Sequence, residues 1–119
     1  MAENQLDYIN NKVKEYTEDK IKFTKRNYER VLERINCTED TVKKEVLSLK
    51  KLVFVEKEIR EFAGSKEERY RCYFVYSNSK GRCYILTFND KLKIITIFPL
   101  GRRTLNKYRK KFKGGLHKI

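Results

Sequence analysis

Tryptophan is absent from this chain of 119 residues, and histidine, proline and methionine occur once each. The single histidine, His117, follows two glycines near the C-terminus, where it cannot easily act as a preorganised base. Cys37, Cys72 and Cys83 show no CxxC spacing, which argues against a zinc site and against a secreted disulfide framework. A bridge between Cys72 and Cys83 is conceivable on neighbouring strands, but small buried thiols are the expected state.

Familiar catalytic and targeting motifs are also missing. No GxxxxGK[ST], GxGxxG or GxSxG motif and no metal-ligand cluster occurs, so neither a metal nor another cofactor is predicted. No apolar run approaches the roughly 20 residues of a membrane span. The start, MAENQLDY, lacks the basic and apolar segments of a secretory signal. The expected location is the cytoplasm.

Acidic residues are scarce in the second half of the chain. Residues 69–119 carry 14 Lys and Arg against Asp90 alone, whereas acids and bases balance in residues 1–68. The net charge of +13 therefore belongs to the second half. Such segregation favours a polyanionic partner, of which nucleic acid is the commonest, and an anionic membrane surface is the weaker alternative.

Apolar residues recur at helical spacing in the first half. Residues 3–19 are predicted to form a helix that packs on its own domain, pairs with a second copy as a homodimer, or covers a binding face. Its apolar stripe consists of Leu6, Ile9, Val13 and Tyr16. A short strand over 20–24 and a helix over 25–35 follow. Thr38 is the predicted N-cap of a further helix to about Leu49, which completes a helical hairpin.

Runs of β-branched and aromatic residues follow the helical hairpin. Strands are predicted over 52–59, 70–76, 82–88 and 91–98, with a loop over 62–68. Pro99 is expected to end the last strand because it has no N–H to donate, and helical turns follow over 104–112. The predicted division is a helical extension (1–19), a main domain (20–113) and a flexible basic tail (114–119). The predicted class is α+β, with an N-terminal helix, a short strand and a helical hairpin packed on an antiparallel meander sheet.

A candidate site follows from the basic residues of the meander. Because the three strands of the meander are successive, their side chains could converge on one sheet face. The set consists of Arg71, Arg82, Arg102, Arg103 and Tyr108. RNA cleavage needs no histidine pair, since the 2′-hydroxyl of the substrate attacks, arginine binds phosphate oxygens and tyrosine stacks or moves protons. The same residues would also suit a surface that binds phosphate without cutting it.

A family resemblance extends over about three quarters of the chain, from Lys20 to Lys111. The segments KIKFT, RYRCYFVY, GRCYILTF, LKIITIFPLG and GRRTLNKY resemble the RelE/ParE toxin superfamily. The segment FTKRNYERVLERINCTEDTV is similar to BrnT-type toxins, with Arg26 where those proteins often place a histidine. The implied fold is RelE-like.

This resemblance implies a toxin of a toxin–antitoxin system that cleaves mRNA, commonly on the ribosome, and is silenced by an acidic antitoxin. The implied catalytic residues are Arg82, which binds the phosphate, Arg103, which stabilises it, and Tyr108. The implied nucleic-acid-binding residues are Arg71, Arg102, Lys107, Arg109, Lys110 and Lys111. Two alternatives stay open, a ParE-like inhibitor that acts by protein contact and a non-catalytic nucleic-acid-binding module of plasmid or viral type.

Overall fold

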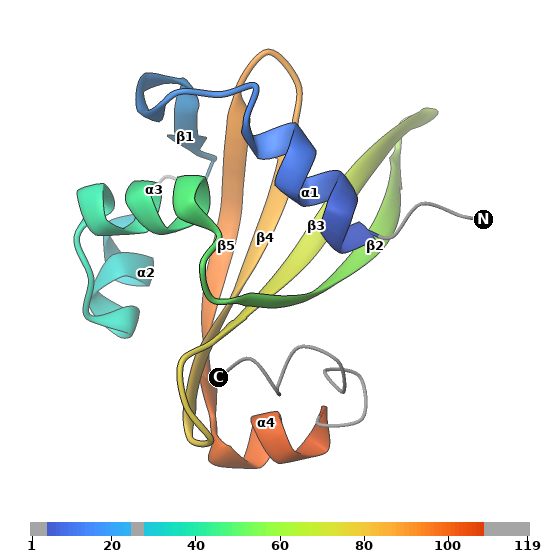
Figure 1. Cartoon of the computed structure of the whole chain (residues 1–119). Coiled ribbons are helices and arrows are strands. Elements are labelled where there is room, and N and C mark those ends of the chain that lie inside the picture. Colours follow the sequence, from blue (N-terminus) through green and yellow to red (C-terminus); the bar gives the residue numbers. More distant parts are fainter. Residues whose placement is uncertain (1–4, 25–27, 109–119) are drawn as a thin grey trace.

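The computed structural model describes residues 5–24 and 28–108 and has an α+β fold (Figure 1). A five-stranded sheet has the order β1-β5-β4-β3-β2, in which β1 is parallel to β5 and all other neighbours are antiparallel. The helices are α1 (Gln5–Val13), α2 (Tyr28–Ile35), α3 (Glu39–Ser48) and α4 (Arg102–Lys107), with a 3₁₀ turn at Glu18–Lys20. The strands are β1 (Ile21–Phe23), β2 (Leu52–Phe62), β3 (Ser65–Val75), β4 (Lys80–Phe88) and β5 (Leu92–Gly101).

Helices α1, α2 and α3 share one hydrophobic core with one face of the sheet, here called the helix face. The predicted stripe of α1 is buried there through Ile9, Val13 and Tyr16, although the helix itself ends at Val13. The stripe therefore packs within the chain, where each fully buried aliphatic side chain contributes about 1.5–3 kcal/mol to the stability of the fold. A homodimer formed through the stripe of α1 remains a prediction. It would require apolar residues that already pack against the sheet.

The hairpin of α2 and α3 was correctly predicted from its cap and turn. Asn36 has a left-handed backbone (φ 55°) after α2, and its N–H donates to the Glu33 carbonyl at 3.1 Å. The Thr38 side chain then accepts from the Thr41 N–H at 3.1 Å and caps α3. A left-handed asparagine after one helix and a threonine before the next are the residues that such a turn favours.

The loop expected over 62–68 is wrong, because β2 and β3 form one long hairpin. Ala63 (φ 46°) and Gly64 (φ 85°) make a two-residue turn, and pairing starts at Phe62 and Ser65. Opposite charges face each other along this hairpin, as in the pairs Glu61–Lys66, Arg60–Glu67, Glu58–Arg69 and Glu56–Arg71. Such cross-strand pairs stabilise a strand that has few apolar residues.

The expected stop at Pro99 is also wrong, since β5 continues to Gly101 with Pro99 opposite Arg82. Strand β1 pairs only with residues 92–94, so the later part of β5 has a neighbour on one side only. Proline is tolerated there because no second strand lies beside it to accept a hydrogen bond from an N–H at that position. Helix α4 consequently begins at Arg102, two residues earlier than expected.

We predict that Gly81→Ala lowers the free energy of unfolding by about 2 kcal/mol, the typical cost of overpacking. A Cβ at Gly81 would lie 2.7 Å from the Phe74 carbonyl oxygen, a backbone atom that cannot move without shifting β3. Gly101→Ala is the matched control: nothing lies within 4 Å of its Cβ position, so only the smaller cost of an alanine at the N-cap of α4 is expected. Urea denaturation measures both variants, and equal losses would contradict the tight contact between β3 and β4.

Candidate nucleic-acid interface

The turn from β3 to β4 and the junction of β5 with α4 lie at one end of the sheet, the lower end in Figure 1, and both carry exposed basic residues. Lys80 pairs with Gly101, which directly precedes α4. The Lys51 carbonyl accepts from the Val75 N–H at 3.0 Å, so the connection before β2 lies beside the last residue of β3. We call this end of the sheet the basic end. Its six exposed basic residues are Lys50, Lys51, Lys80, Arg102, Arg103 and Lys107.

No acid of the described ranges 5–24 and 28–108 forms a salt bridge with any of these six residues. Their positive charges are therefore not neutralised by that part of the chain. Clustered, exposed and uncompensated cations attract phosphates and release the counterions that those phosphates hold. The basic end has the electrostatic character that a nucleic-acid backbone requires.

Leu105 fixes α4 and its arginines on the face of the sheet opposite the three other helices. Its side chain is buried in a second, smaller core with Val53, Tyr73, Val75, Cys83 and Leu100. Gly101 is the N-cap of the helix, and Arg102 and Arg103 form its exposed first turn. One buried leucine on a short helix thus positions both arginines at the edge of the basic end.

Arg82 does not join the other predicted site residues, which corrects the expected convergence on one face. It lies opposite Phe74 on the helix face, where its Nη1 donates to Oε1 of Glu45 from α3 at 3.3 Å. The hydroxyl of Tyr76 donates to the same carboxylate at 2.5 Å, and that of Tyr84 donates to it as well. Burial and then the carboxylate raise the pKa of both phenols, so both remain donors.

Arg71 and Tyr108 lie on the opposite sheet face, among groups from β2 that the sequence pattern did not reveal. Arg71 Nε is 3.5 Å from Glu58 Oε2, and the Tyr73 hydroxyl donates to Glu56 Oε1 at 2.8 Å. The Tyr73 and Tyr108 rings are 6.0 Å apart, and Lys107 Nζ lies 5.8 Å from the Tyr108 ring centre. Burial and then the Glu56 hydrogen bond raise the pKa of Tyr73. Acids of the first half therefore compensate Arg71.

The described positions of the predicted set divide into three places. Arg102, Arg103 and Lys107 lie at the basic end, Arg71 and Tyr108 lie on the face that carries α4, and Arg82 lies on the helix face. Arg109, Lys110 and Lys111 fall outside the described residues. Lys50, Lys51 and Lys80 belong to the basic end but were not predicted, because their proximity depends on strand pairing rather than on sequence neighbourhood.

All three cysteines are free, as the sequence indicated. Burial raises the pKa of the Cys83 thiol to about 12 and that of Cys72 also rises, so both act as small apolar side chains. They belong to different cores on the two faces of the sheet. No cluster of three His, Cys, Asp or Glu that could hold a metal occurs within 5–24 and 28–108. In the same ranges, no helix is long and apolar enough to cross a membrane.

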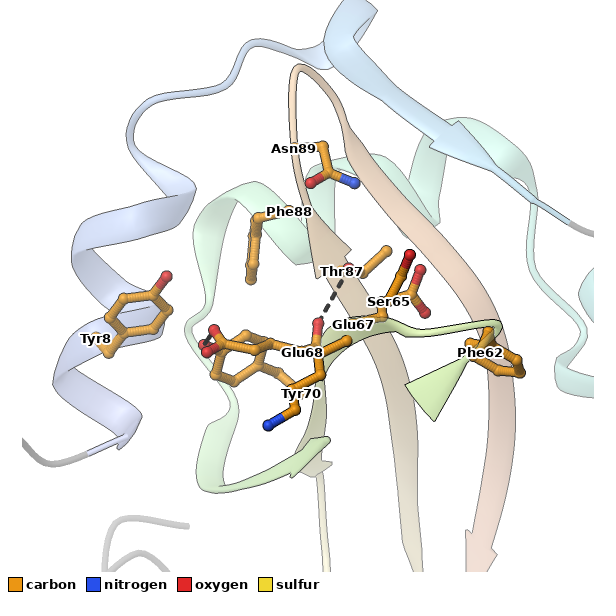
Figure 2. Close-up of a pocket in the computed structure, with 10 residues that line it drawn as sticks. Tyr8, Phe62, Ser65, Glu67, Glu68, Tyr70, Thr87, Phe88 and Asn89 are labelled. Atoms are coloured by element: carbon orange, nitrogen blue, oxygen red, sulfur yellow. Dashed lines mark hydrogen bonds between the residues drawn. The ribbon is translucent and has the colours of Figure 1, made fainter. Parts of the chain in front are cut away.

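A groove of about 460 Å³ lies at the other end of the sheet, between α1, the β2–β3 hairpin and the end of β4 (Figure 2). Tyr8 of α1 stacks on Tyr70 with their ring centres 5.2 Å apart. Glu68 accepts from the Tyr70 hydroxyl at 3.0 Å and pairs with Lys57 at 3.1 Å, while Glu67 pairs with Arg69 at 2.6 Å. Its acids are thus already paired, and the groove lacks the positive charge of the basic end.

Comparisons with protein-family models, with curated proteins and with solved structures found no match to this chain. The resemblance to the RelE/ParE superfamily therefore depends on the sequence segments quoted above.

We predict that Glu45→Ala destabilises the fold by about 3 kcal/mol, because it leaves the buried Tyr84 phenol, the half-buried Tyr76 phenol and the Arg82 guanidinium without their shared acceptor. Glu29→Ala is the matched control, since Glu29 is exposed on α2. Urea denaturation gives both values. A loss below about 0.5 kcal/mol for Glu45→Ala, the range of ordinary surface changes, would show that this carboxylate does not hold α3 on the sheet.

Proposed function

We propose that the protein binds RNA through the phosphate backbone at its basic end. The observation that carries the proposal is the group of six exposed cations that no described acid neutralises. Charge alone favours any nucleic acid, and the resemblance to the RelE/ParE superfamily favours RNA. In that setting the protein would act in the cytoplasm as the toxin of a toxin–antitoxin pair, with an acidic antitoxin covering the basic end.

The second candidate is cleavage of the bound RNA, possible on or off the ribosome, as in RelE-type toxins. Arg103 supports it, because this exposed arginine lies at the basic end where a phosphate would be held. Arg82 and Arg71 argue for binding without cleavage, because they pair with Glu45 and Glu58. Tyr108 lies at the end of α4, with its ring against Tyr73. Binding is therefore the function that the geometry supports best.

We predict that Arg102→Ala/Arg103→Ala weakens binding to a single-stranded RNA at least about tenfold. Each phosphate contact contributes about −0.7 to the slope of log K against log salt for single strands, so the slope should become shallower by about 1.4. Lys22→Ala/Lys91→Ala removes the same charge at exposed positions of β1 and of the turn before β5, at the far end of the sheet. Fluorescence anisotropy over a salt series measures all three proteins.

Equal losses in the two double variants would contradict a localised site, because net charge alone would then account for binding. A duplex DNA of the same length and a vesicle of anionic lipid serve as competing ligands in the same titrations. Stronger binding to either one than to RNA would overturn the assignment of RNA as the ligand. Salt-independent binding would exclude the phosphate backbone as the main contact.

We predict that, if RNA cleavage occurs, Arg103→Ala/Tyr108→Phe abolishes it while the fold is retained. The reason is that a guanidinium stabilises the charge that develops on the phosphate, and a phenol moves a proton or stacks on a base. The assay is incubation of nuclease-free protein with mRNA, with and without ribosomes, followed by separation of the fragments. Identical fragments from the wild type and the variant would assign the cutting to another site or to a contaminant.

A further inference from the structure

The outer edge of β2 has no strand beside it along the described chain. Strand β2 is the last strand of the sheet, and no backbone hydrogen bond from the described residues reaches its outer side over residues 57–62. Such an edge carries a row of free N–H and C=O groups that can pair with another strand. The two most exposed large apolar side chains of the described residues, Ile59 (57%) and Phe62 (54%), both belong to this strand.

The turn between β2 and β3 determines which groups point outward. In a two-residue hairpin the closing residues, here Phe62 and Ser65, form a hydrogen-bonded pair. Every second residue before Phe62 therefore bonds to β3, and the residues between them direct their N–H and C=O groups to the open edge. The outward set in the exposed part of the strand consists of Lys57, Ile59 and Glu61.

We propose that this edge pairs antiparallel with the same edge of a second copy of the chain, with Ile59 at the two-fold axis. Lys57 then lies opposite Glu61 of the partner subunit, and Glu58 lies opposite Arg60 of the partner subunit. Ile59 lies opposite Ile59 of the partner subunit and becomes covered. The two sheets join into one sheet of ten strands, and the interface is isologous, as a two-fold axis requires.

Charge selects this register over its neighbours. Only a register that matches outward residues with outward residues can form the ladder, so shifts that pair odd with even positions are excluded. Registers centred on Lys57, Glu58, Arg60 or Glu61 each place a charged residue directly opposite itself. Like charges in that position destabilise a strand pair, whereas opposite charges stabilise it. The register centred on Ile59 places an opposite charge across from each of the four charged residues.

Side-chain direction is consistent with the same arrangement. Side chains alternate along β2, so one face carries Lys57, Ile59 and Glu61 and the other carries Glu58 and Arg60. A two-fold axis perpendicular to the sheet places equivalent faces of the two subunits on the same side of the joined sheet. Every proposed pair therefore joins side chains of one face. Glu61 is exposed, and Lys66 Nζ is as far as 4.0 Å from its carboxylate, so Glu61 can reach Lys57 of the partner subunit. Lys57 pairs with Glu68 at 3.1 Å, but its exposed ammonium has three donors and can bind a second carboxylate.

Two single variants and their mixture test the proposal. Glu61→Lys places two lysines opposite each other at both symmetric positions, and Lys57→Glu does the same with two glutamates. Sedimentation equilibrium should show a dimer for the wild type and an association constant reduced at least about tenfold in each variant. Mixing the two variants restores opposite charges at both positions, so a heterodimer of wild-type affinity is expected.

Glu29→Lys is the matched control for Glu61→Lys, because it makes the same charge change at an exposed position of α2. It should dimerise like the wild type, and circular dichroism confirms the fold of every variant. A wild type that remains monomeric at the highest attainable concentration would overturn the proposal and would mean that the edge charges serve only to prevent pairing. Dimers that persist in both single variants, or variants that do not form a heterodimer when mixed, would overturn the interface or its register.

Discussion

Opposite charges facing each other across β2 and β3 are the interaction on which much of this molecule depends. The pairs Glu61–Lys66, Arg60–Glu67, Glu58–Arg69 and Glu56–Arg71 keep two polar segments in register as strands. Salt bridges within and across the same hairpin occupy most of its acids, and they join Glu58 to Arg60 and Arg71, Glu61 to Lys66, Glu67 to Arg69 and Glu68 to Lys57. The basic end receives no such acids, so its cations remain available to a ligand. The placement of the acids in the β2–β3 hairpin thus both stabilises the hairpin and leaves the basic end positively charged.

The alternation of side chains along a strand decides which cations can act together. Arg71 and Arg82 lie on adjacent strands, but Arg71 pairs with Ile85 in the ladder and Arg82 with Phe74, which places them on opposite faces. Arg82 then meets Glu45 beneath α3 and links the helical hairpin to the sheet. A guanidinium that holds the fold together is a poor phosphate ligand. The proposed RNA-binding surface therefore lies at the basic end and does not include Arg82.

Local sequence signals predicted much of the fold. The stripe of α1, the Thr38 cap and the apolar strands around Phe74, Tyr84 and Ile94 all followed from spacing and side-chain type. The β2–β3 hairpin was missed because its apolar content is low, and its signal lies in complementary charges on either side of Ala63 and Gly64. Pro99 was misjudged because its effect depends on whether a second strand lies beside it.

The candidate site was harder to predict than the fold, because its members come together through pairing between distant segments. Arg102, Arg103 and Lys107 were identified from one continuous run. Lys51 and Lys80 join them only because the first residues of β2 and β4 lie beside the last residues of β3 and β5. Glu56 and Glu58, which moderate the charge around Arg71, come from the half of the chain whose charges balance. The sequence therefore identified three of the six cations of the basic end and missed Lys50, Lys51 and Lys80.

Photo-crosslinking of the wild-type protein to an RNA that contains 4-thiouridine tests the central claim most directly, since it reports contacts without altering the protein. Mass spectrometry of the crosslinked peptides identifies the residues that touch the RNA. RNA bound at the basic end should crosslink within residues 50–51, 77–82 and 101–107. Crosslinks confined to residues 57–69, at the end of the sheet that carries the groove of Figure 2, would contradict the account.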